Sequence, residues 1–145
     1  MDYWDTSALV KLYVAEADSA YFLQLLTTKD EPIASSAIAA AEVLCVLFRK
    51  EQAGALRRGG GRRIYSKFKS DVSAGRILTI PYSHDVEAEV EKVASRVFTR
   101  KGVVLIRSLD LIHVATALSG GARDLVTTDV RLREVSKIVG LNVIP

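Results

Sequence analysis

The feature of this sequence that most constrains its fold is the alternation of short apolar segments with longer segments of helical periodicity. In the longer segments, apolar residues recur every three or four positions, as they do along one face of an amphipathic helix. Strands are predicted in the short segments, at Asp2 to Trp4, Pro32 to Ser35, Arg76 to Ile80, Leu125 to Thr127 and Leu141 to Ile144. Short apolar strands separated by helices are typical of a parallel sheet covered on both faces. We therefore predict an α/β fold.

Helices are predicted between these strands from periodicity and from residues that start or end helices. They cover about Ala8 to Glu16, Asp18 to Thr27, Ala37 to Glu51, Arg62 to Ser73, Asp85 to Arg100, Leu109 to Leu118 and Val130 to Val139. Serines are expected to cap the third, fifth and sixth of them: Ser35 or Ser36, Ser83 and Ser108. Gly54 and the run Gly59 to Gly61 are expected to break the chain after the third helix. The segment Val103 to Ile106 fits either a short strand or a buried loop.

The length and composition are those of one globular domain, residues 1–145, with 49% hydrophobic and 26% charged residues. The formal net charge is only +3, so any contact with nucleic acid must come from local basic patches. No apolar stretch reaches the ~20 residues of a membrane span, and acids at Asp2 and Asp5 replace the basic start of a signal peptide. We expect a cytoplasmic protein without a membrane partner. The single cysteine, Cys45, lies in the run VLCVLF and is expected to be a buried thiol.

Four acidic residues lie in surroundings that are unusual for surface acids. Asp5 lies in WDTSA, Glu42 in AAAEV, Asp110 in RSLDLIHVATAL and Asp129 in VTTDV. Each is expected directly after a strand or in the first turns of a helix, among small or apolar neighbours where a lone carboxylate is costly to desolvate. Ligands of a parallel sheet bind beyond the carboxyl ends of its strands. Asp5, Glu42 and Asp129 are therefore expected at one rim, and Asp110 joins them if its helix also begins there.

Each acid, taken singly, also has a structural explanation. Asp5 and Asp129 suit helix caps, Asp110 suits the positive end of a helix dipole, and Glu42 suits a solvated helix position. Taken together they favour a shared site, because crowded carboxylates need a compensating cation, and Mg²⁺ or Mn²⁺ prefers oxygen ligands. Two such cations can activate water against a phosphodiester. The sequence has no Walker A loop, GxGxxG motif or nucleophile elbow, so nucleotide triphosphate use and a Ser-His-Asp triad have no support.

The acids lie in four segments: DTSALVKLY, AAAEV, SLDLIHVATAL, and LVTTDVRL followed by GLNVIP. Together these segments resemble the PIN-domain ribonucleases, and most of all the VapC-type toxins of bacterial and archaeal toxin–antitoxin pairs. The similarity extends through nearly the whole chain, although little of the motif lies between about Gln52 and Arg100. The resemblance implies a single PIN-like domain with a three-layer α/β/α fold.

The resemblance also implies a function, partners and products. It implies a metal-dependent endoribonuclease that cleaves RNA phosphodiester bonds as the toxin of a toxin–antitoxin pair. It implies a homodimer and a cognate antitoxin protein as partners. If the protein follows related metal nucleases, cleavage leaves a 5′-phosphate and a 3′-hydroxyl.

The resemblance assigns roles to six residues of this sequence. Asp5 and Asp110 are expected to be the main ligands of Mg²⁺ or Mn²⁺. Glu42 and Asp129 are expected to complete the site, directly or through water. Ser7 and Thr127 match small hydroxyl positions beside the acids and are expected to orient a carboxylate, a water or a phosphate.

Two other functions stay open at this point. One is a PIN-type nuclease that acts in RNA processing, or on DNA, without a toxin role. The other is a non-catalytic RNA-binding or regulatory module that keeps the acids only for folding. The acids alone do not separate these alternatives from a toxin.

The segment Arg57 to Lys69 contains six basic residues and no acid. It fits a phosphate-contacting patch, a solvated helix face or a surface for an acidic antitoxin segment, and these alternatives stay open. Tyr65 and Phe68 within it can in principle stack on unpaired bases, but their helical spacing favours packing in the core.

Three other residues with rings are expected in the interior. Tyr3 and Trp4 flank Asp5 on opposite faces of a strand, and both are expected in the core or an interface. His113 shares a helix face with Asp110. We expect it to pack between apolar neighbours with one ring nitrogen satisfied, in preference to bonding an acid or a phosphate. His84 carries no functional signal.

Overall fold

Among the residues that the structure describes, the central sheet has five strands, and every pairing between neighbouring strands is parallel. This computed structural model describes residues 1–28, 31–102 and 104–145. The strands are β1 (Asp2–Trp4), β2 (Ile33–Ser36), β3 (Ile77–Ile80), β4 (Asp124–Val126) and β5 (Asn142–Ile144). Their order across the sheet is β3-β2-β1-β4-β5. The predicted α/β fold with a parallel sheet is confirmed.

Strand β1 lies in the middle of the sheet and marks the point where the strand order reverses. From β1 the chain builds β2 and β3 on one side, and it then returns to build β4 and β5 on the other. Tyr3 is in register with Ala34 of β2 and with Leu125 of β4. A crevice opens beyond the carboxyl ends of the strands at such a switch point, because the connections leave toward opposite faces of the sheet. The residues that directly follow β1 and β4 therefore lie at a natural binding position.

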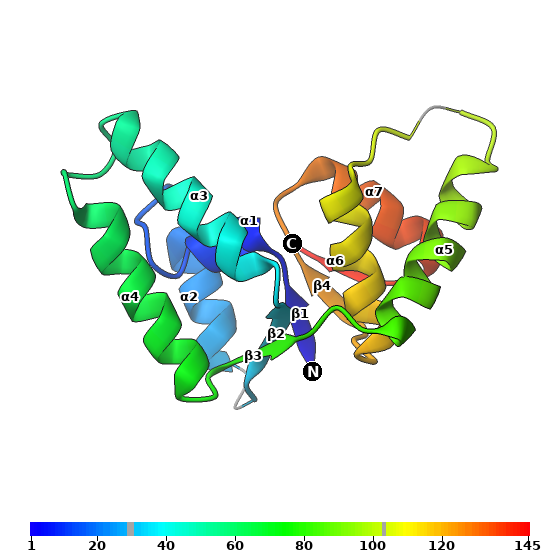
Figure 1. Cartoon of the computed structure of the whole chain (residues 1–145), viewed down its shortest axis with the longest axis horizontal. Helices are drawn as coiled ribbons and strands as arrows, with labels where there is room; N and C mark the ends of the chain where they lie inside the picture. Colours follow the sequence, from blue (N-terminus) through cyan, green and yellow to red (C-terminus); the bar gives the residue numbers. More distant parts are fainter. Residues whose placement is uncertain (29–30, 103) are drawn as a thin grey trace.

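The helices form a layer on each face of the sheet, which confirms the three-layer α/β/α arrangement (Figure 1). They are α1 (Thr6–Val10), α2 (Ser19–Thr28), α3 (Ala39–Gln52), α4 (Gly60–Ser73), α5 (His84–Phe98), α6 (Ser108–Ser119) and α7 (Val130–Val139). Helices α1 to α4 form one lobe, in which α3 packs against α4. Helices α5 to α7 form the other lobe, in which α5 packs against α6.

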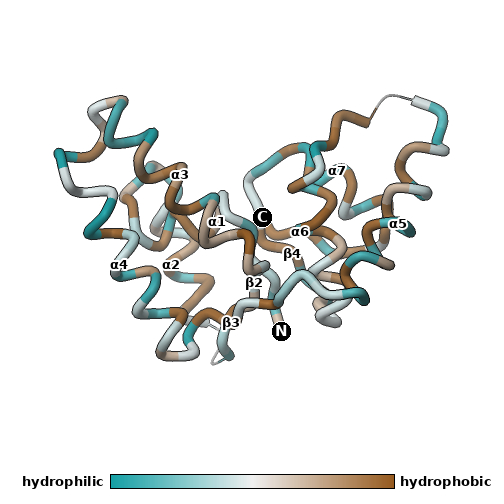
Figure 2. Tube along the Cα trace, in the orientation of Figure 1, coloured by the Kyte–Doolittle hydropathy of each residue, from teal (hydrophilic) through white to brown (hydrophobic). Residues whose placement is uncertain are grey.

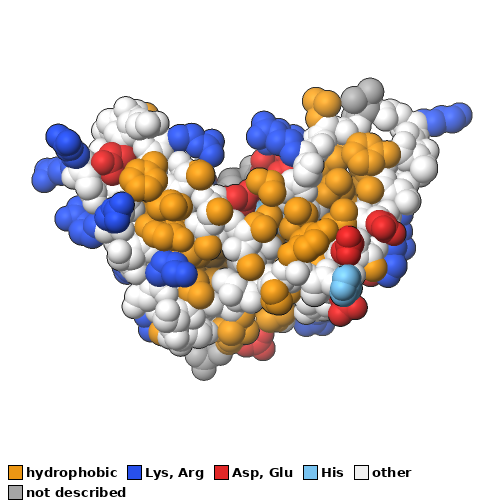
Figure 3. Space-filling model, in the orientation of Figure 1, with side chains coloured by type: hydrophobic (Ala, Val, Ile, Leu, Met, Phe, Trp, Pro, Cys, Tyr) orange, Lys and Arg blue, Asp and Glu red, His pale blue; other side chains and the backbone are white. Residues whose placement is uncertain are grey.

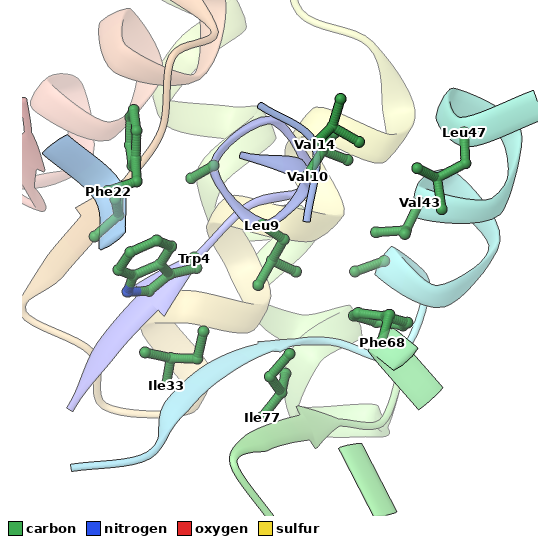
Figure 4. Packing of buried hydrophobic residues seen from close by; sticks show 13 residues of the cluster. Trp4, Leu9, Val10, Val14, Phe22, Ile33, Val43, Leu47, Phe68 and Ile77 are labelled. Atoms are coloured by element: carbon green, nitrogen blue, oxygen red, sulfur yellow. The ribbon is translucent and has the colours of Figure 1, made fainter. Parts of the chain in front are cut away.

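Two hydrophobic clusters join these helices to the two faces of the sheet. Trp4, which is 1% exposed, belongs to the cluster under α1 to α4, together with Leu9, Phe22, Val43, Leu47 and Phe68 (Figure 4). Tyr3 is fully buried in the other cluster, together with Val93, Val97, Val114, Leu125 and Leu132. Hydrophobic residues concentrate on α1 and α6, near the middle of the molecule (Figure 2). The prediction that Tyr3 and Trp4 are buried on opposite faces is confirmed.

Two of the three predicted serine caps are wrong, because Ser35 bonds a neighbouring strand and Ser108 lies inside its helix. Helix α3 begins at Ala39, with Ile38 at its N-cap and no side-chain cap. The Ser35 hydroxyl instead donates to the carbonyl oxygen of Trp4 at 2.7 Å, which ties β2 to β1. Helix α6 includes Ser108 as its first residue. The third cap is confirmed, because Ser83 Oγ accepts a hydrogen bond from the amide of Val86.

Other predicted boundaries also move. Helix α1 ends at Val10 and turns follow it, so the helix predicted to reach Glu16 is much shorter. Gly54, at φ +77°, directly follows the C-cap of α3, which confirms the predicted end of this helix. Of the run Gly59 to Gly61, Gly59, at φ +76°, breaks the chain before α4, whereas Gly60 and Gly61 already lie in this helix. Residues 104–106 form a loop rather than a strand, and Val103 lies outside the described residues.

Cys45 is exposed, contrary to the expectation of a buried thiol. An apolar run on a helix passes around the whole circumference, and here Val43 and Leu47 take the core face of α3. Cys45 falls on the face that lines the cleft described below. In the described ranges, no helix is both long and apolar enough to cross a bilayer.

Candidate active site

A cleft of about 540 Å³ lies beyond the carboxyl ends of the central strands, between α1 and α3 on one side and α6 and α7 on the other. It is lined by all four predicted acids, Asp5, Glu42, Asp110 and Asp129. The space-filling view shows this hollow between the two lobes, with acidic side chains at its base and basic side chains on both sides (Figure 3). The predicted meeting of the four acids at one rim of the sheet is therefore observed, including that of Asp110.

Asp5 lies at the floor of the cleft, directly after β1. It is the N-cap of α1, where its Oδ1 accepts hydrogen bonds from the amide of Ala8 at 3.1 Å and from the hydroxyl of Ser7 at 2.8 Å. The residue is only 3% exposed. Burial raises the pKa of the Asp5 carboxyl, and the charge of His113 and these hydrogen bonds oppose the rise without cancelling it. Asp5 therefore caps α1 and also lines the cleft.

Glu42 is held by two partners from other elements. Its Oε2 accepts a hydrogen bond from Thr6 Oγ1 at 2.5 Å and lies 2.6 Å from His113 Nε2. Burial alone raises the pKa of Glu42, but the bonds from His113 and Thr6 and the charge of His113 outweigh burial, so the pKa is lowered. The alternative explanation of Glu42 as a solvated helix position is therefore wrong.

His113 connects Glu42 to Tyr3 through the interior of the protein. The ring is 2% exposed, with Nε2 next to Glu42 and Nδ1 2.7 Å from the Tyr3 hydroxyl. With a proton on Nε2 the ring donates to Glu42, while Nδ1 bonds the Tyr3 hydroxyl. The expectation that one ring nitrogen is satisfied among apolar neighbours is therefore wrong. Both nitrogens have polar partners, and one partner is an acid of the cleft.

The lowered pKa of Glu42 gives a testable pH dependence. A carboxyl whose folded pKa lies below its unfolded value stabilises the protein above the unfolded value, about 4.3, and this stabilisation is lost as pH falls through the folded pKa. Unfolding in urea, measured from pH 6 to pH 3, is expected to show a shallower loss of stability for Glu42→Gln than for the wild type. Equal slopes for the two proteins contradict the assignment of Glu42 as a bonded carboxylate.

Asp110 and Asp129 share one basic side chain, Arg131. Asp129 is the N-cap of α7 and accepts a hydrogen bond from the amide of Arg131 at 2.8 Å. The guanidinium of Arg131 lies 3.0 Å from Asp129 through Nη2 and 3.9 Å from Asp110 Oδ2 through Nε. Burial alone raises the pKa of Asp129, but its bonds to Arg131 outweigh burial and lower it. Asp110 also accepts from the amide of Arg107 at 3.0 Å.

Ser7 and Thr127 lie where two loops meet under the acids. The Ser7 hydroxyl donates to Asp5 and accepts from the amide of Thr128 at 2.9 Å. Thr127 is fully buried, and its Oγ1 accepts from the amide of Asp129 at 3.0 Å. The bond between Ser7 and Thr128 ties the β1–α1 turn to the β4–α7 loop. The Ser7 hydroxyl contacts the carboxylate of Asp5, whereas Thr127 contacts the backbone amide of Asp129.

The carboxylates offer the oxygen atoms that Mg²⁺ and Mn²⁺ prefer, so the chemistry of the donor set fits a divalent cation. Their present spacing is wider than a ready-made site requires, because no three Asp, Glu, His or Cys side chains of residues 1–28, 31–102 and 104–145 stand close enough to hold a metal. Three of the acids contact other side chains instead: His113 and Thr6 hold Glu42, and Arg131 holds Asp110 and Asp129.

Among the side chains that contact the four acids, the sequence reasoning missed Thr6 and Arg131, and it wrongly disfavoured an acid partner for His113. Arg131 follows Asp129 by two positions in a helix start, and a basic residue there signals a local carboxylate partner. Thr6 had no comparable signal. Its bond to Glu42 joins residues 36 positions apart and becomes visible only when α1 and α3 are packed together.

The basic stretch from Arg57 to Lys69 lies mostly on α4, outside the cleft lining. Phe68 is fully buried and Tyr65 packs against the same core cluster, so the preference for core packing is confirmed for both. Glu51 accepts hydrogen bonds from the amides of Gly59 and Gly61, which fixes the turn that begins this stretch.

Comparison with known proteins agrees with this architecture. The PIN domain family matches residues 3–138. Ribonuclease VapC46 of Mycobacterium tuberculosis (strain ATCC 25618 / H37Rv) is 34% identical over 147 aligned positions, which cover 98% of this chain and 95% of that protein.

Solved structures share the fold at lower identity. VapBC2 from Rickettsia felis, bound to a DNA fragment from its promoter, has a chain that matches with a TM-score of 0.70 and 22% identity, over 99% of this chain and 98% of that chain. A toxin–antitoxin complex from Klebsiella pneumoniae has a chain that matches with a TM-score of 0.67 and 17% identity, over 100% of this chain and 97% of that chain. By its sequence match and its topology, the chain belongs to the PIN-domain family.

Proposed function

We propose that residues 1–145 form one nuclease domain and that the protein is a Mg²⁺- or Mn²⁺-dependent endoribonuclease. One observation carries the proposal: four carboxylates from four separate segments line one cleft at the switch point of a parallel sheet. Such a cluster is expensive to build without a cation, and a PIN-domain relative is a ribonuclease by name. RNA is therefore the proposed substrate.

In the active protein, Asp5 and Asp110 are the proposed metal ligands, and Glu42 and Asp129 complete the site directly or through water. A divalent cation held there supplies an acidified water and neutralises charge on the phosphate and the leaving oxygen. Ser7 and Ala8 keep the Asp5 carboxylate pointed in one direction by donating to Oδ1. His113 and Thr6 fix Glu42 in the same way.

The walls of the cleft suit a polyanionic substrate. Arg49 of α3 and Arg107, directly before α6, are both exposed and line the cleft from its two sides. Arginine side chains bind phosphates through paired N–H groups. We infer that these two residues hold RNA phosphates on either side of the carboxylates. In this proposal the scissile bond lies over the floor of the cleft.

The proposed setting is that of a toxin paired with an antitoxin protein in the cytoplasm. Solved relatives of this fold include VapBC and other toxin–antitoxin complexes, which is what suggests an antitoxin for this chain. We also propose that the protein forms a homodimer.

Incubation of the purified protein with a defined RNA pool tests the function. We expect cleavage with Mg²⁺ or Mn²⁺, none with EDTA, and products that carry a 5′-phosphate and a 3′-hydroxyl by mass spectrometry. A 2′,3′-cyclic phosphate overturns the proposed product chemistry. Specific RNA binding without cleavage under any metal supports the non-catalytic alternative instead.

A further inference from the structure

The guanidinium of Arg131 lies between two of the proposed metal ligands. It forms a two-point contact with Asp129, through Nη2 at 3.0 Å and Nε at 3.4 Å, and its Nε lies 3.9 Å from Asp110. The side chains of Asp110 and Asp129 are 14% and 26% exposed, so this pairing is sheltered from full solvent screening.

The carboxylates of Asp110 and Asp129 come from different helices, α6 and α7, and two like charges at one place repel each other. A cation between them removes this repulsion. Arg131 supplies that cation from the first turn of α7, where its own backbone amide also fixes Asp129. The side chain is 34% exposed on the cleft, so it has solvent-filled space into which it can move.

We propose that Arg131 is an internal substitute for the divalent cation. Its guanidinium occupies the Asp110–Asp129 side of the cleft in the metal-free protein and must leave it when metal binds. This inference rests on the proposed metal site. It explains why the four acids share one cleft while no three of the described metal-binding side chains are close enough to form a ready-made site. The guanidinium makes the metal-free protein stable and sets a threshold of metal concentration below which the site stays unassembled.

Isothermal titration with Mn²⁺ alone tests the proposal on the purified full-length chain. Removing an internal competitor frees the carboxylates in advance, so Arg131→Gln is expected to bind Mn²⁺ roughly three- to tenfold more tightly than the wild type. Without Mn²⁺, the same variant is expected to have a lower Tm, because Asp110 and Asp129 then repel each other. Its Tm is expected to rise more steeply with added Mn²⁺ than that of the wild type.

Arg107→Gln is the matched control. Arg107 is an arginine of the same cleft, and the ion pairs of Asp110 and Asp129 described above involve the guanidinium of Arg131 instead. Removal of Arg107 therefore changes the local charge equally without breaking those pairs. We expect its Mn²⁺ affinity to rise less than that of Arg131→Gln. Arg131→Lys keeps the charge and loses the two-point contact, so its affinity is expected between those of the wild type and Arg131→Gln.

Equal affinities of the wild type and Arg131→Gln overturn the proposal, and so do equal gains for Arg131→Gln and Arg107→Gln. If Arg131→Gln does not fold, Arg131→Lys decides: an affinity equal to that of the wild type counts against the proposal, and a tighter one supports it. These outcomes differ from a failure of the proposed function, in which the wild type itself binds no Mn²⁺ in the cleft.

Discussion

Replacement of Asp5 by asparagine is expected to reduce RNA cleavage at least about a hundredfold, since even the outer partners of metal ligands contribute about ten- to a hundredfold and Asp5 is a proposed ligand itself. Asn keeps the size of the side chain and an oxygen that accepts from Ala8 and Ser7, so the helix cap survives. It removes the negative charge that a divalent cation requires. Initial rates of cleavage of a labelled RNA with saturating Mn²⁺ measure the effect.

The stability of the same variant separates a catalytic from a structural role. Burial raises the pKa of Asp5, so this carboxyl destabilises the metal-free fold increasingly as pH rises above the unfolded pKa. The full cost is reached above the folded pKa, and none remains below the unfolded pKa. Asp5→Asn is therefore expected to unfold at a Tm at least as high as that of the wild type at pH 7 without metal. Asp85→Asn, an exposed acid in the first turn of α5, serves as the control and is expected to change neither activity nor Tm. Full cleavage by Asp5→Asn contradicts the proposed role.

Replacement of Phe68 by alanine is expected to lower the free energy of unfolding by about 3 to 5 kcal/mol. Phe68 is fully buried, and its ring lies edge-on to Tyr13 and stacked on Tyr65, each at 5.9 Å between ring centroids. Alanine leaves a cavity at the point where α4 packs into the hydrophobic cluster under α1 to α4. Urea unfolding followed by circular dichroism measures the loss.

Phe68→Leu is the companion variant, because it removes the aromatic ring but fills most of the space. It is expected to cost less than about 1.5 kcal/mol and to leave RNA affinity unchanged. If Phe68 stacked on RNA bases, Phe68→Leu would instead weaken RNA binding with little effect on stability. That pattern would contradict the assignment of this ring to the core. It would support the alternative in which aromatic residues of the basic stretch stack on RNA bases.

The order of strands and helices along the chain was predictable from the sequence, because hydrophobic periodicity is a local property. The gathering of Asp5, Glu42 and Asp129 was also predictable, since residues after adjacent parallel strands reach the same rim. Helix starts were less predictable. Serines near α3 and α6 fit caps by type, but the hydroxyl of Ser35 found a partner in the neighbouring strand instead.

The partners within the site were the least predictable part. The contact between Glu42 and His113 joins residues 71 positions apart, and it depends on how α3 and α6 approach each other. The hydroxyl of Tyr3, 110 positions from His113, supplies the second ring contact. Composition and spacing identify groups able to bond, but the packing of whole elements selects which of them meet. Cys45 illustrates the same limit, because an apolar run does not tell which side of its helix faces solvent.

The most direct test of the account is a crystal of the protein grown with Mn²⁺ and measured for anomalous scattering. The account predicts a peak in the cleft within about 2.0 to 2.3 Å of carboxylate oxygens of both Asp5 and Asp110, with the Arg131 guanidinium withdrawn from Asp110. A crystal of Asp5→Asn under the same conditions should lack that peak or show it weakened. A saturated wild-type crystal with no peak in the cleft, or with peaks only elsewhere, contradicts the claim that these carboxylates share a divalent ion.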